Sequence, residues 1–577
     1  MRTADWFVLC ATLLFIVVYG VWKGRRQKDL EGYLLADREL RWYTIALSIM
    51  ATQASAITFL STPGQAYSDG MRFVQFYLGL PIAMVILSIT AVPIYHRLKV
   101  FTAYEYLEGR FGVGTRTLTA MLFLIQRGVS TGITMYAPAL ILSVILGWNI
   151  YITNLVIGVL VIIYTTSGGT KAVSWTHMHQ LAIALGGMAV ALVIAIRSLP
   201  GNMTLLEAAG VAGRMGRLNA IDFTFDLTNR YNFWSGLIGG LFIALSYFGT
   251  DQSQVQRYLT GETVGQSRLG LLFNGIVKVP MQFFILFVGA MVFVFYQFVA
   301  PPLSFNPVQR ANIATSIYAN DYAQLEEQHR RTFNEKRGHV TGLVGAMRAG
   351  DDARADRETT TIRALQARES STRKAAAELI RKHDPLADTS DTNFVFLSFV
   401  IRNLPVGLVG LVMAAIFCAA MSATSSGLNS LASTTVVDIY KRFVAKEQTD
   451  LNYVRVSKLL TVFWGVFSIG FAFFAGRLGS LIEAVNILGS LFYGTILGIF
   501  MLAFYFPRVG GRAAFLGAIV GEAVVVYCWL FTKIAYLWWT VVGCVVGVVA
   551  ALVIQAFLPR DGKKWSAAES GGAPVTS

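Results

Sequence analysis

Apolar runs long enough to cross a lipid bilayer recur along the whole chain, separated by shorter polar stretches. A helix needs about 20 residues to cross a hydrocarbon core of roughly 30 Å. Hydropathy averaged over windows of about 19 residues predicts about thirteen membrane-spanning helices. The predicted spans lie at residues 6–22, 43–62, 73–95, 116–145, 149–166, 178–198, 234–250, 271–299, 405–434, 453–476, 480–506, 512–532 and 536–558. We therefore expect an all-α membrane protein and exclude a soluble core of this length.

The first apolar run, from Trp6 to Trp22, is followed by the basic stretch KGRRQK. A secretory signal peptide would instead be followed by a small-residue cleavage site. The run is therefore predicted to be a retained membrane span.

Lys and Arg concentrate in short connections between the spans, which include KGRRQKDLEGYLLADRELR, HRLK, GGTK, DIYKRFVAKEQ and PRVGGR. Short loops rich in Lys and Arg face the cytoplasm. We therefore expect an integral protein of the plasma membrane, or of the cytoplasmic membrane if the source is bacterial. Its amino terminus is expected outside and its carboxyl terminus inside.

Residues 301–393 interrupt the alternation with a long run that is rich in charge and alanine. Ala, Arg, Glu and Leu dominate it and Pro is absent from 321 to 384, a composition that favours helices. The topology places this insertion outside, because long loops can be translocated despite basic charge. The pattern fits two interpretations. The insertion is a solvated cap or partly disordered loop, or it is a domain that binds a partner.

The composition agrees with a membrane protein. Of 577 residues, 55% are hydrophobic and 14% charged, with a mean hydropathy of +0.55, whereas soluble domains carry about a quarter charged residues. The net charge of +15 reflects basic connections and the insertion, so positive-inside topology explains it better than nucleic acid binding. All four cysteines fall in apolar runs without metal-ligand spacing. No HExxH motif or Ser/His/Asp arrangement sits at membrane depth, so an enzyme is not expected.

Two predicted spans are broken by polar residues at membrane depth. The second contains SIMATQASAITFLSTPG, and the seventh ends in ALSYFGTDQSQ. Irregular backbone is tolerated at this depth only against other protein or a wet cavity. Interrupted helices in matching positions of two halves are typical of inverted-repeat transporters, although small polar stretches also serve as packing surfaces.

The ninth span carries many small hydroxyl residues just before a charged end. Ser422, Ser425 and Ser426 stand at positions i, i+3 and i+4 and therefore share one helical face. Hard cations such as sodium prefer oxygen ligands, which hydroxyls and the freed carbonyls of a broken helix supply. Close helix packing is the other interpretation of this serine-rich face.

Five motifs in order make the chain resemble the sodium/solute symporter family, which includes sodium/glucose, proline, iodide, monocarboxylate and sialic acid transporters. They are GYLLADRELRW, TAYEYLEGRFG, TSGGTKAVSWTHMHQ, YFGTDQSQVQRYL and MSATSSGLNSLASTTVVDIYK. STPGQAYSDGMRFV and MYAPALIL look most like the iodide, multivitamin and monocarboxylate branch. The resemblance implies the leucine-transporter fold, with two inverted repeats of five helices, one helix before them and two after.

This resemblance divides the chain into segments. They are an extra span and cytoplasmic linker at 1–42, the first repeat at 43–198, an outer loop at 199–233, the start of the second repeat at 234–300, the helical insertion at 301–393, the rest of the second repeat at 394–506, and two extra spans with a short tail at 507–577.

The family's shared sodium site maps onto the second and ninth spans. The matching positions are Ala51 and Ala54, which would offer carbonyls, then Ala419, Ser422 and Ala423. Ala423 departs from the family, where most relatives have a Ser or Thr hydroxyl. The resemblance implies that one sodium ligand is missing or replaced here.

A second sodium site of some relatives matches Ser422, Ser425 and Ser426 together with an aspartate that is here His177. An imidazole is a poor replacement for a carboxylate around sodium. We therefore predict no ordinary second sodium ion. Proton sensitivity through His177 and a histidine without any coupling role are both open.

Sugar-carrying relatives use Gln, Glu and Asn at positions that align with Thr58, Tyr77 and Ala244, which disfavours a glucose-like solute. The remaining candidates for substrate binding are polar residues matched to the family's pocket or lying in the broken second span. Together the candidates are Gln53, Thr58, Tyr77, Arg127, Tyr247, Lys278 and Glu483.

Arg127 stands about a dozen residues into its span, where a charge costs several kcal/mol unless it is paired or hydrated. A guanidinium can bind a carboxylate through two parallel hydrogen bonds. Arg127 could therefore bind an anionic solute, or equally form a structural pair with Asp251 or Glu483.

These features predict a sodium-coupled symporter that moves a small solute across the bilayer by alternating access, with a small organic anion such as a monocarboxylate as the first candidate. A sugar or other neutral solute is the alternative within the family. A membrane sensor or scaffold that keeps the fold but transports little is the alternative from another class. The implied cofactor is Na⁺, and the implied partners are the solute and the lipid bilayer.

Overall fold

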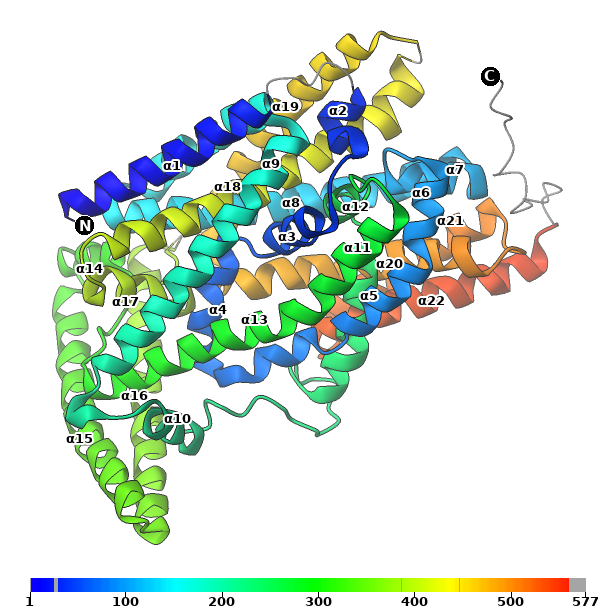
Figure 1. Cartoon of the computed structure of the whole chain (residues 1–577). Coiled ribbons are helices and arrows are strands. Elements are labelled where there is room, and N and C mark those ends of the chain that lie inside the picture. Colours follow the sequence, from blue (N-terminus) through cyan, green and yellow to red (C-terminus); the bar gives the residue numbers. More distant parts are fainter. Residues whose placement is uncertain (1, 25–29, 386, 446, 560–577) are drawn as a thin grey trace.

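The computed structural model describes residues 2–24, 30–385, 387–445 and 447–559, and the side chains of 167–173 and 175–178, among a few others within helices, lie outside the described part. Within these ranges the chain is helical, and its only bridge between extended residues joins Leu40 to Gly261. The all-α prediction is therefore confirmed for the described residues. Figure 1 shows most of the long helices running side by side as one bundle, with α15 and α16 standing across its end.

The helices follow one another along the chain with few long connections, and η marks 3-10 or π-helical segments. The first half contains α1 (Thr3–Gly24), α2 (Leu30–Leu35), η1 (Ala36–Arg38), α3 (Trp42–Gln53), α4 (Ala56–Asp69), η2 (Gly70–Tyr77), α5 (Leu80–Ile89), α6 (Ala91–Leu98), α7 (Ala103–Phe111), α8 (Val113–Leu146), α9 (Ile150–Arg197), η3 (Pro200–Asn202), α10 (Leu205–Arg214), η4 (Ser235–Gly239), α11 (Gly240–Gly249), α12 (Gln252–Tyr258) and α13 (Val264–Phe298). The second half contains α14 (Pro307–Ala314), α15 (Ala319–Ala349), α16 (Asp352–His383), η5 (Asp391–Asn393), α17 (Val395–Asn403), α18 (Leu408–Thr434), η6 (Thr435–Val444), α19 (Asp450–Ala475), η7 (Gly476–Leu478), α20 (Leu481–Tyr505), α21 (Gly511–Phe531) and α22 (Tyr536–Phe557).

Nine helical segments within the described residues are long and apolar enough to cross a membrane, and three shorter apolar segments accompany them. The shorter segments are Thr3–Phe15, Ile150–Thr166 and Ser235–Gly249. The spans expected at 149–166 and 178–198 both fall within α9. The count of thirteen spans and the division into two repeats of five stay predictions.

α18 is the central helix of the bundle. In the span that contains α18, 78% of the most apolar 18-residue stretch is buried. The corresponding share is only 33% for the spans of α19 and α21, so those two helices form the periphery. α18 packs against α1, α3, α8 and α9. The serine-rich sequence thus lies in the protein interior and not against lipid.

Both polar breaks predicted from the sequence are present. α3 ends at Gln53 and α4 begins at Ala56, with Ala54 and Ser55 in non-helical conformations. The amide of Ser55 donates to the carbonyl of Gln53 at 3.1 Å, so the helical hydrogen bond to the carbonyl of Ala51 is not made. In the seventh span, α11 ends at Gly249, and α12 begins after Asp251.

The broken helix α4 approaches its neighbours so closely that two glycines are required. A methyl group on Gly64 would lie 1.9 Å from the backbone oxygen of Thr392 in η5. One on Gly289 of α13 would lie 2.1 Å from the backbone oxygen of Pro63. These contacts fix the position of α4, whose first turn borders a cavity inside the bundle.

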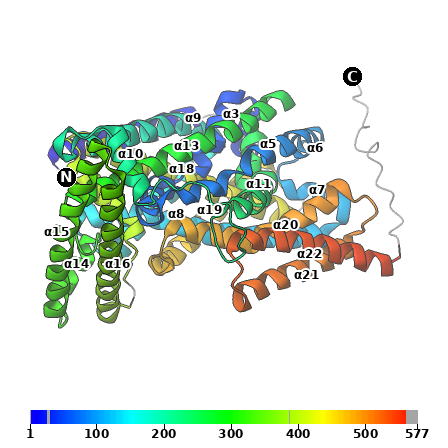
Figure 2. The same ribbon diagram turned by 90° about the horizontal axis from the view of Figure 1, so that it is seen from below.

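The insertion forms the helices that its composition predicts. α15 and α16 pair as an antiparallel hairpin at one end of the bundle (Figures 1 and 2). Lys336 and Glu369 form a buried ion pair between the two helices. Surface ion pairs then join the hairpin to α10, with Arg214 bound to Asp356 at 2.8 Å and Arg348 bound to Glu207 at 2.7 Å. The hairpin is therefore a defined part of the structure.

Candidate functional site

A cavity with a mixed apolar and polar lining, which we call the central cavity, lies beside the two helix breaks. Its walls come from the α3–α4 break, η2, α5, α8, α11 and α20, and it holds about 790 Å³ of empty space, counting the part open to solvent. Near the first break, the lining residues are Gln53 at the end of α3, Ser55 in the unwound segment, and Ile57 and Thr58 in the first turn of α4. Five of the seven candidate substrate residues line this cavity, namely Gln53, Thr58, Tyr77, Arg127 and Tyr247.

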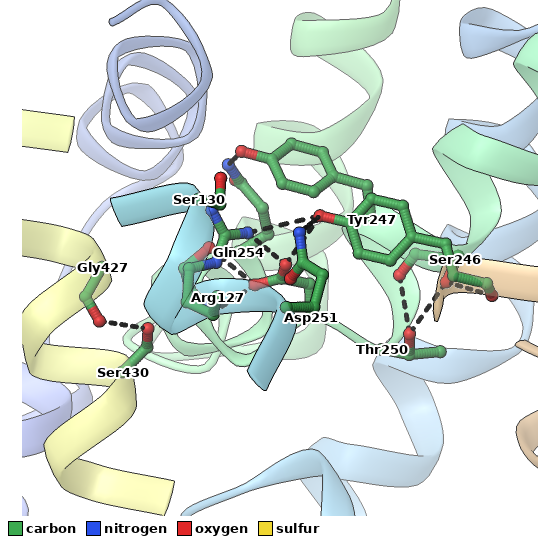
Figure 3. A network of polar contacts seen from close by, with 12 residues as sticks. Arg127, Ser130, Ser246, Tyr247, Thr250, Asp251, Gln254, Gly427 and Ser430 are labelled. Carbon is green, nitrogen blue, oxygen red and sulfur yellow. Dashed lines mark hydrogen bonds and ion pairs between the residues drawn. The ribbon is translucent and has the colours of Figure 1, made fainter. Parts of the chain in front are cut away.

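Arg127 of α8 is paired with Asp251 at the second helix break (Figure 3). The side chain of Asp251 is fully buried, while 12% of the Arg127 side chain is exposed. The other oxygen of the carboxylate accepts the Ser253 amide at 2.9 Å and the Ser253 hydroxyl at 2.7 Å. Of the two carboxylates that the sequence left open as partners of Arg127, the structure places Asp251 against it.

Two tyrosines complete the surroundings of this ion pair. The hydroxyl of Tyr493 in α20 donates to Asp251 Oδ2 at 3.0 Å and lies 3.5 Å from Arg127 Nη2. The ring of Tyr247 has its centre 5.6 Å from the guanidinium carbon of Arg127, and Gln254 donates to the Tyr247 hydroxyl at 2.7 Å. Arg127 Nε is buried and has no hydrogen-bond partner among the described residues. The Nε–H edge of the guanidinium therefore carries a hydrogen-bond donor that the described residues do not use.

Lys278 of α13 lies just behind the cavity wall. Its ammonium nitrogen is 5.8 Å from the ring centre of Tyr77, which lines the cavity. The side chain is buried, and its nitrogen has no hydrogen-bond partner among the described residues. A lysine in this state at membrane depth is costly and marks a functional position by default.

Glu483 does not line this cavity, although it was a candidate for substrate binding. It pairs with Arg230 at 2.5 Å and accepts the Tyr231 hydroxyl at 3.1 Å. Gln65 of α4 approaches the same carboxylate at 3.4 Å. Glu483 therefore belongs to a separate hollow, where loop residues near 230 meet the start of α20.

The candidate sodium positions lie on α3 and α18, which pack together. Thr52 Oγ1 at the end of α3 is 3.4 Å from Ser426 Oγ of α18. The carbonyl of Ala51 is released by the break, and the hydroxyl of Ser422 is buried without a partner among the described residues. An unpaired buried hydroxyl and a free carbonyl are oxygen donors that suit Na⁺, so the residues present fit the ion.

The other candidate positions are placed less directly. Ala419 is buried and Ala423 partly buried in α18, and Ala54 lies in the break itself. Ser425 donates to the carbonyl of Ser422 at 3.0 Å. His177 belongs to α9, but its side chain lies outside the described residues.

Several lining residues were not predicted from the sequence. Ser130, Asn486 and Tyr493 line the cavity beside the predicted candidates. Tyr493 stands in the middle of the span 480–506 between Ser490 and Thr495, and this group of hydroxyl residues at membrane depth is the signal that could have indicated it.

Comparison with known proteins gives a consistent picture. The model described as the sodium:solute symporter family matches residues 33–326 and 383–521, and the unmatched interval falls on the hairpin. The putative sodium-dependent multivitamin transporter of Drosophila melanogaster is 26% identical over 528 residues, covering 90% of this chain and 73% of that protein. The human sodium-coupled monocarboxylate transporter 1 is 27% identical over 523 residues, covering 90% and 72%. The human sodium/iodide cotransporter is 33% identical over 295 residues, covering 51% and 45%.

A solved structure of a Na⁺-coupled sialic acid symporter in a substrate-bound, outward-open state has a TM-score of 0.75 to this chain at 22% identity. The match covers 97% of this chain and 99% of that one. At this level of identity, the likeness establishes a shared fold.

Proposed function

This chain belongs to the sodium:solute symporter family, and from that premise we propose that its solute is a small organic anion such as a monocarboxylate. The family makes it an integral membrane transporter that couples solute movement to sodium, and not an enzyme. The monocarboxylate relatives support an anionic solute, and the cavity chemistry supports it independently.

The observation that carries the proposal is that two basic side chains stand at the central cavity against a single carboxylate. Arg127 lines it and Lys278 lies behind its wall, whereas Asp251 is the only carboxylate within reach of either one among the described contacts. Asp251 is already bound to Arg127 and Ser253. A bound carboxylate would accept a hydrogen bond from the unpaired Nε–H of Arg127.

We propose that sodium binds between the α3–α4 break and α18, with Ala51, Ala54, Ala419 and Ser422 as ligands and Ala423 offering only its backbone. The packing of Thr52 on Ser426 supports this location. Sodium at this point would hold the broken helix against α18 and thereby order Gln53 and Thr58, which line the central cavity. Because the two sites are linked, the solute must raise sodium affinity by the same factor.

The transport cycle would be alternating access between two repeats of five helices, within about thirteen spans, with the amino terminus outside and the carboxyl terminus inside. Ser425 and Ser426, with His177, remain candidates for a second cation site. The two shortened helices α3 and α11, which end at the cavity, support the repeat arrangement.

Matched acids and amides test the proposed solute class. We would measure thermal unfolding of the purified protein with lactate or lactamide, each with sodium or with choline. Lactate at ten times its dissociation constant should stabilise the protein by about 1.4 kcal/mol in sodium only, and lactamide should have no effect. A similar effect of lactamide, or of a neutral sugar, would overturn the anion proposal in favour of a neutral solute. Sodium-independent binding without uptake into vesicles would favour a sensor.

A further inference from the structure

A second hollow lies on the face of the bundle that carries the hairpin, and its floor is rich in arginine. Five charged residues line it, and we call it the arginine hollow: Asp69, Arg72, Arg217, Arg230 and Glu483. It holds about 1000 Å³ of empty space, counting the part open to solvent.

The carboxylates of the arginine hollow do not balance its guanidinium groups. Glu483 is bound to Arg230 at 2.5 Å, and Asp69 accepts a hydrogen bond from Gln65 at 2.5 Å. Neither Arg72 nor Arg217 forms an ion pair among the described residues. The lining of the hollow therefore holds three guanidinium groups against two carboxylates, with Asp222 as a further carboxylate near Arg72 outside the lining.

Arg217 is held in a fixed position. Its side chain stacks on Phe293 with 4.4 Å between guanidinium carbon and ring centre, and it donates to the carbonyl of Ser68. Its Nε is buried and has no partner among the described residues. A guanidinium that is positioned in advance loses less entropy when it binds an oxyanion.

The backbone brings Arg217 and Arg72 together. The amide of Met71, one residue before Arg72, donates to the carbonyl of Arg217 at 2.9 Å. Gly70 has φ +76°, and a methyl group there would lie 2.9 Å from the same carbonyl oxygen, so this close approach depends on glycine. The hairpin also holds the end of α10, just before Arg217, because Arg214 at that end is bound to Asp356 of α16 at 2.8 Å.

The arginine hollow lies next to the central cavity, behind a layer of aromatic rings. Tyr231 lines the hollow and its ring centre is 5.3 Å from that of Phe73. Phe73 stacks on Phe76 at 5.6 Å, and Phe76 lines the central cavity. Glu483 of the hollow and Ile482 of the cavity are adjacent in α20.

We propose that the arginine hollow is a capture site for small carboxylates, which bind to Arg72 and Arg217 before they pass the aromatic layer to the central cavity. That the captured anion is also the transported solute rests on the proposed function. That the hollow binds small carboxylates does not. Such a site raises the local concentration of an anionic solute and its rate of association.

The test measures anion attraction at the hollow without requiring transport. Asn219 lines the hollow, is exposed, and its side chain has no hydrogen bond among the described residues. Asn219→Cys therefore places a reactive thiol in the hollow. The background protein carries Cys10→Ala, because Cys10 is exposed and would also react. We would compare its rates of reaction with anionic sulfonatoethyl and cationic trimethylammonioethyl methanethiosulfonate. Arg72→Gln should lower the anionic-to-cationic rate ratio by about three- to fivefold at low ionic strength. Exposed Arg337 of the hairpin is the matched control, and Arg337→Gln should leave the ratio unchanged.

A second arm separates a carboxylate site from mere positive potential. Sodium acetate at 50 mM should slow the anionic reagent about twofold more than 50 mM sodium chloride, and this difference should vanish in Arg72→Gln. An unchanged rate ratio in Arg72→Gln, or equal effects of acetate and chloride, would overturn the capture site.

Uptake then distinguishes this proposal from the proposed function. If the solute is a carboxylate, Arg72→Gln should raise KM several-fold at low salt and leave kcat within twofold. If the protein takes up no carboxylate, the proposed function is overturned. The reaction rates of the cysteine at position 219 still test whether the hollow binds anions.

Discussion

The ion pair between Arg127 and Asp251 allows the structural and the ligand-binding roles of the arginine to be separated. We consider three variants, Arg127→Gln, Asp251→Asn and the combination of both. If the pair is purely structural, each single variant loses stability and the double variant regains part of it. If Arg127 also binds the solute, the two single variants must shift anion affinity in opposite directions.

The magnitudes follow from the burial of the two groups. In Arg127→Gln the fully buried carboxylate of Asp251 loses its counter-ion, a change that costs about 3–5 kcal/mol in buried pairs. Three hydrogen bonds to the carboxylate remain, from the Ser253 amide, the Ser253 hydroxyl and Tyr493, so we expect the lower end, about 3 kcal/mol. Asp251→Asn leaves a guanidinium beside an open cavity, and its cost should be about 1–2 kcal/mol.

Anion affinity provides the decisive measurement. Asp251→Asn removes the competing carboxylate, so the released guanidinium should bind lactate about tenfold more tightly, a gain of about 1.4 kcal/mol. Arg127→Gln should weaken lactate binding by at least about tenfold. Calorimetry on detergent-solubilised protein, together with thermal unfolding, would give both quantities. A folded Arg127→Gln variant with unchanged lactate affinity would refute the ligand role.

Three further predictions concern sodium, pH and packing. Ser422→Ala should weaken sodium binding about tenfold in a scintillation proximity assay with ²²Na⁺, whereas Ser433→Ala, which removes a hydroxyl bonded to the carbonyl three residues earlier, should not. Burial raises the pKa of Asp388, in the loop after the hairpin, to about 7. The unfolded carboxyl titrates near pH 3.9, so the folded state holds one more proton than the unfolded state between pH 4 and 7. The free energy of unfolding should therefore fall by about 1 kcal/mol per pH unit as pH rises through that window. Asp388→Asn should flatten this slope, and an unchanged slope would contradict the role of Asp388. Gly64→Ala should lower the free energy of unfolding by about 1–3 kcal/mol, and with it the thermal midpoint, because the added methyl group would meet the backbone of Thr392. Gly213→Ala is the control. It should be neutral or stabilising, because no atom lies within 4 Å of the added methyl group.

The sequence predicted the local features of the fold because these depend on short-range composition. Polar residues around Gln53 and the TDQSQ stretch after Gly249 indicated helix breaks, and both breaks are confirmed. The insertion was predicted to be helical from its Ala, Arg and Glu content, and α15 and α16 confirm this. The five ordered motifs indicated the family that the comparisons establish.

Long-range pairing could not be predicted in the same way. Asp251 and Glu483 were equivalent partners for Arg127 because the sequence does not say which helices are neighbours. In the structure Glu483 is bound by Arg230, a residue of an irregular loop whose path no periodicity indicates. Tyr493 was missed for a similar reason, since it is one of several hydroxyl residues in α20, and it is seen to line the cavity only once α20 is placed beside α11.

The paired helices α15 and α16 also have a practical consequence for imaging the molecule. With 31 and 32 residues they are each roughly 45 Å long. Contacts of α15 with α10 and α13, and the ion pair between Arg214 and Asp356 of α16, anchor them to the bundle. A transporter of this size is otherwise a featureless object inside a detergent micelle. This rigid rod gives each particle an asymmetric landmark for alignment in electron cryo-microscopy, and a ready epitope for antibody fragments that need not touch the transport path.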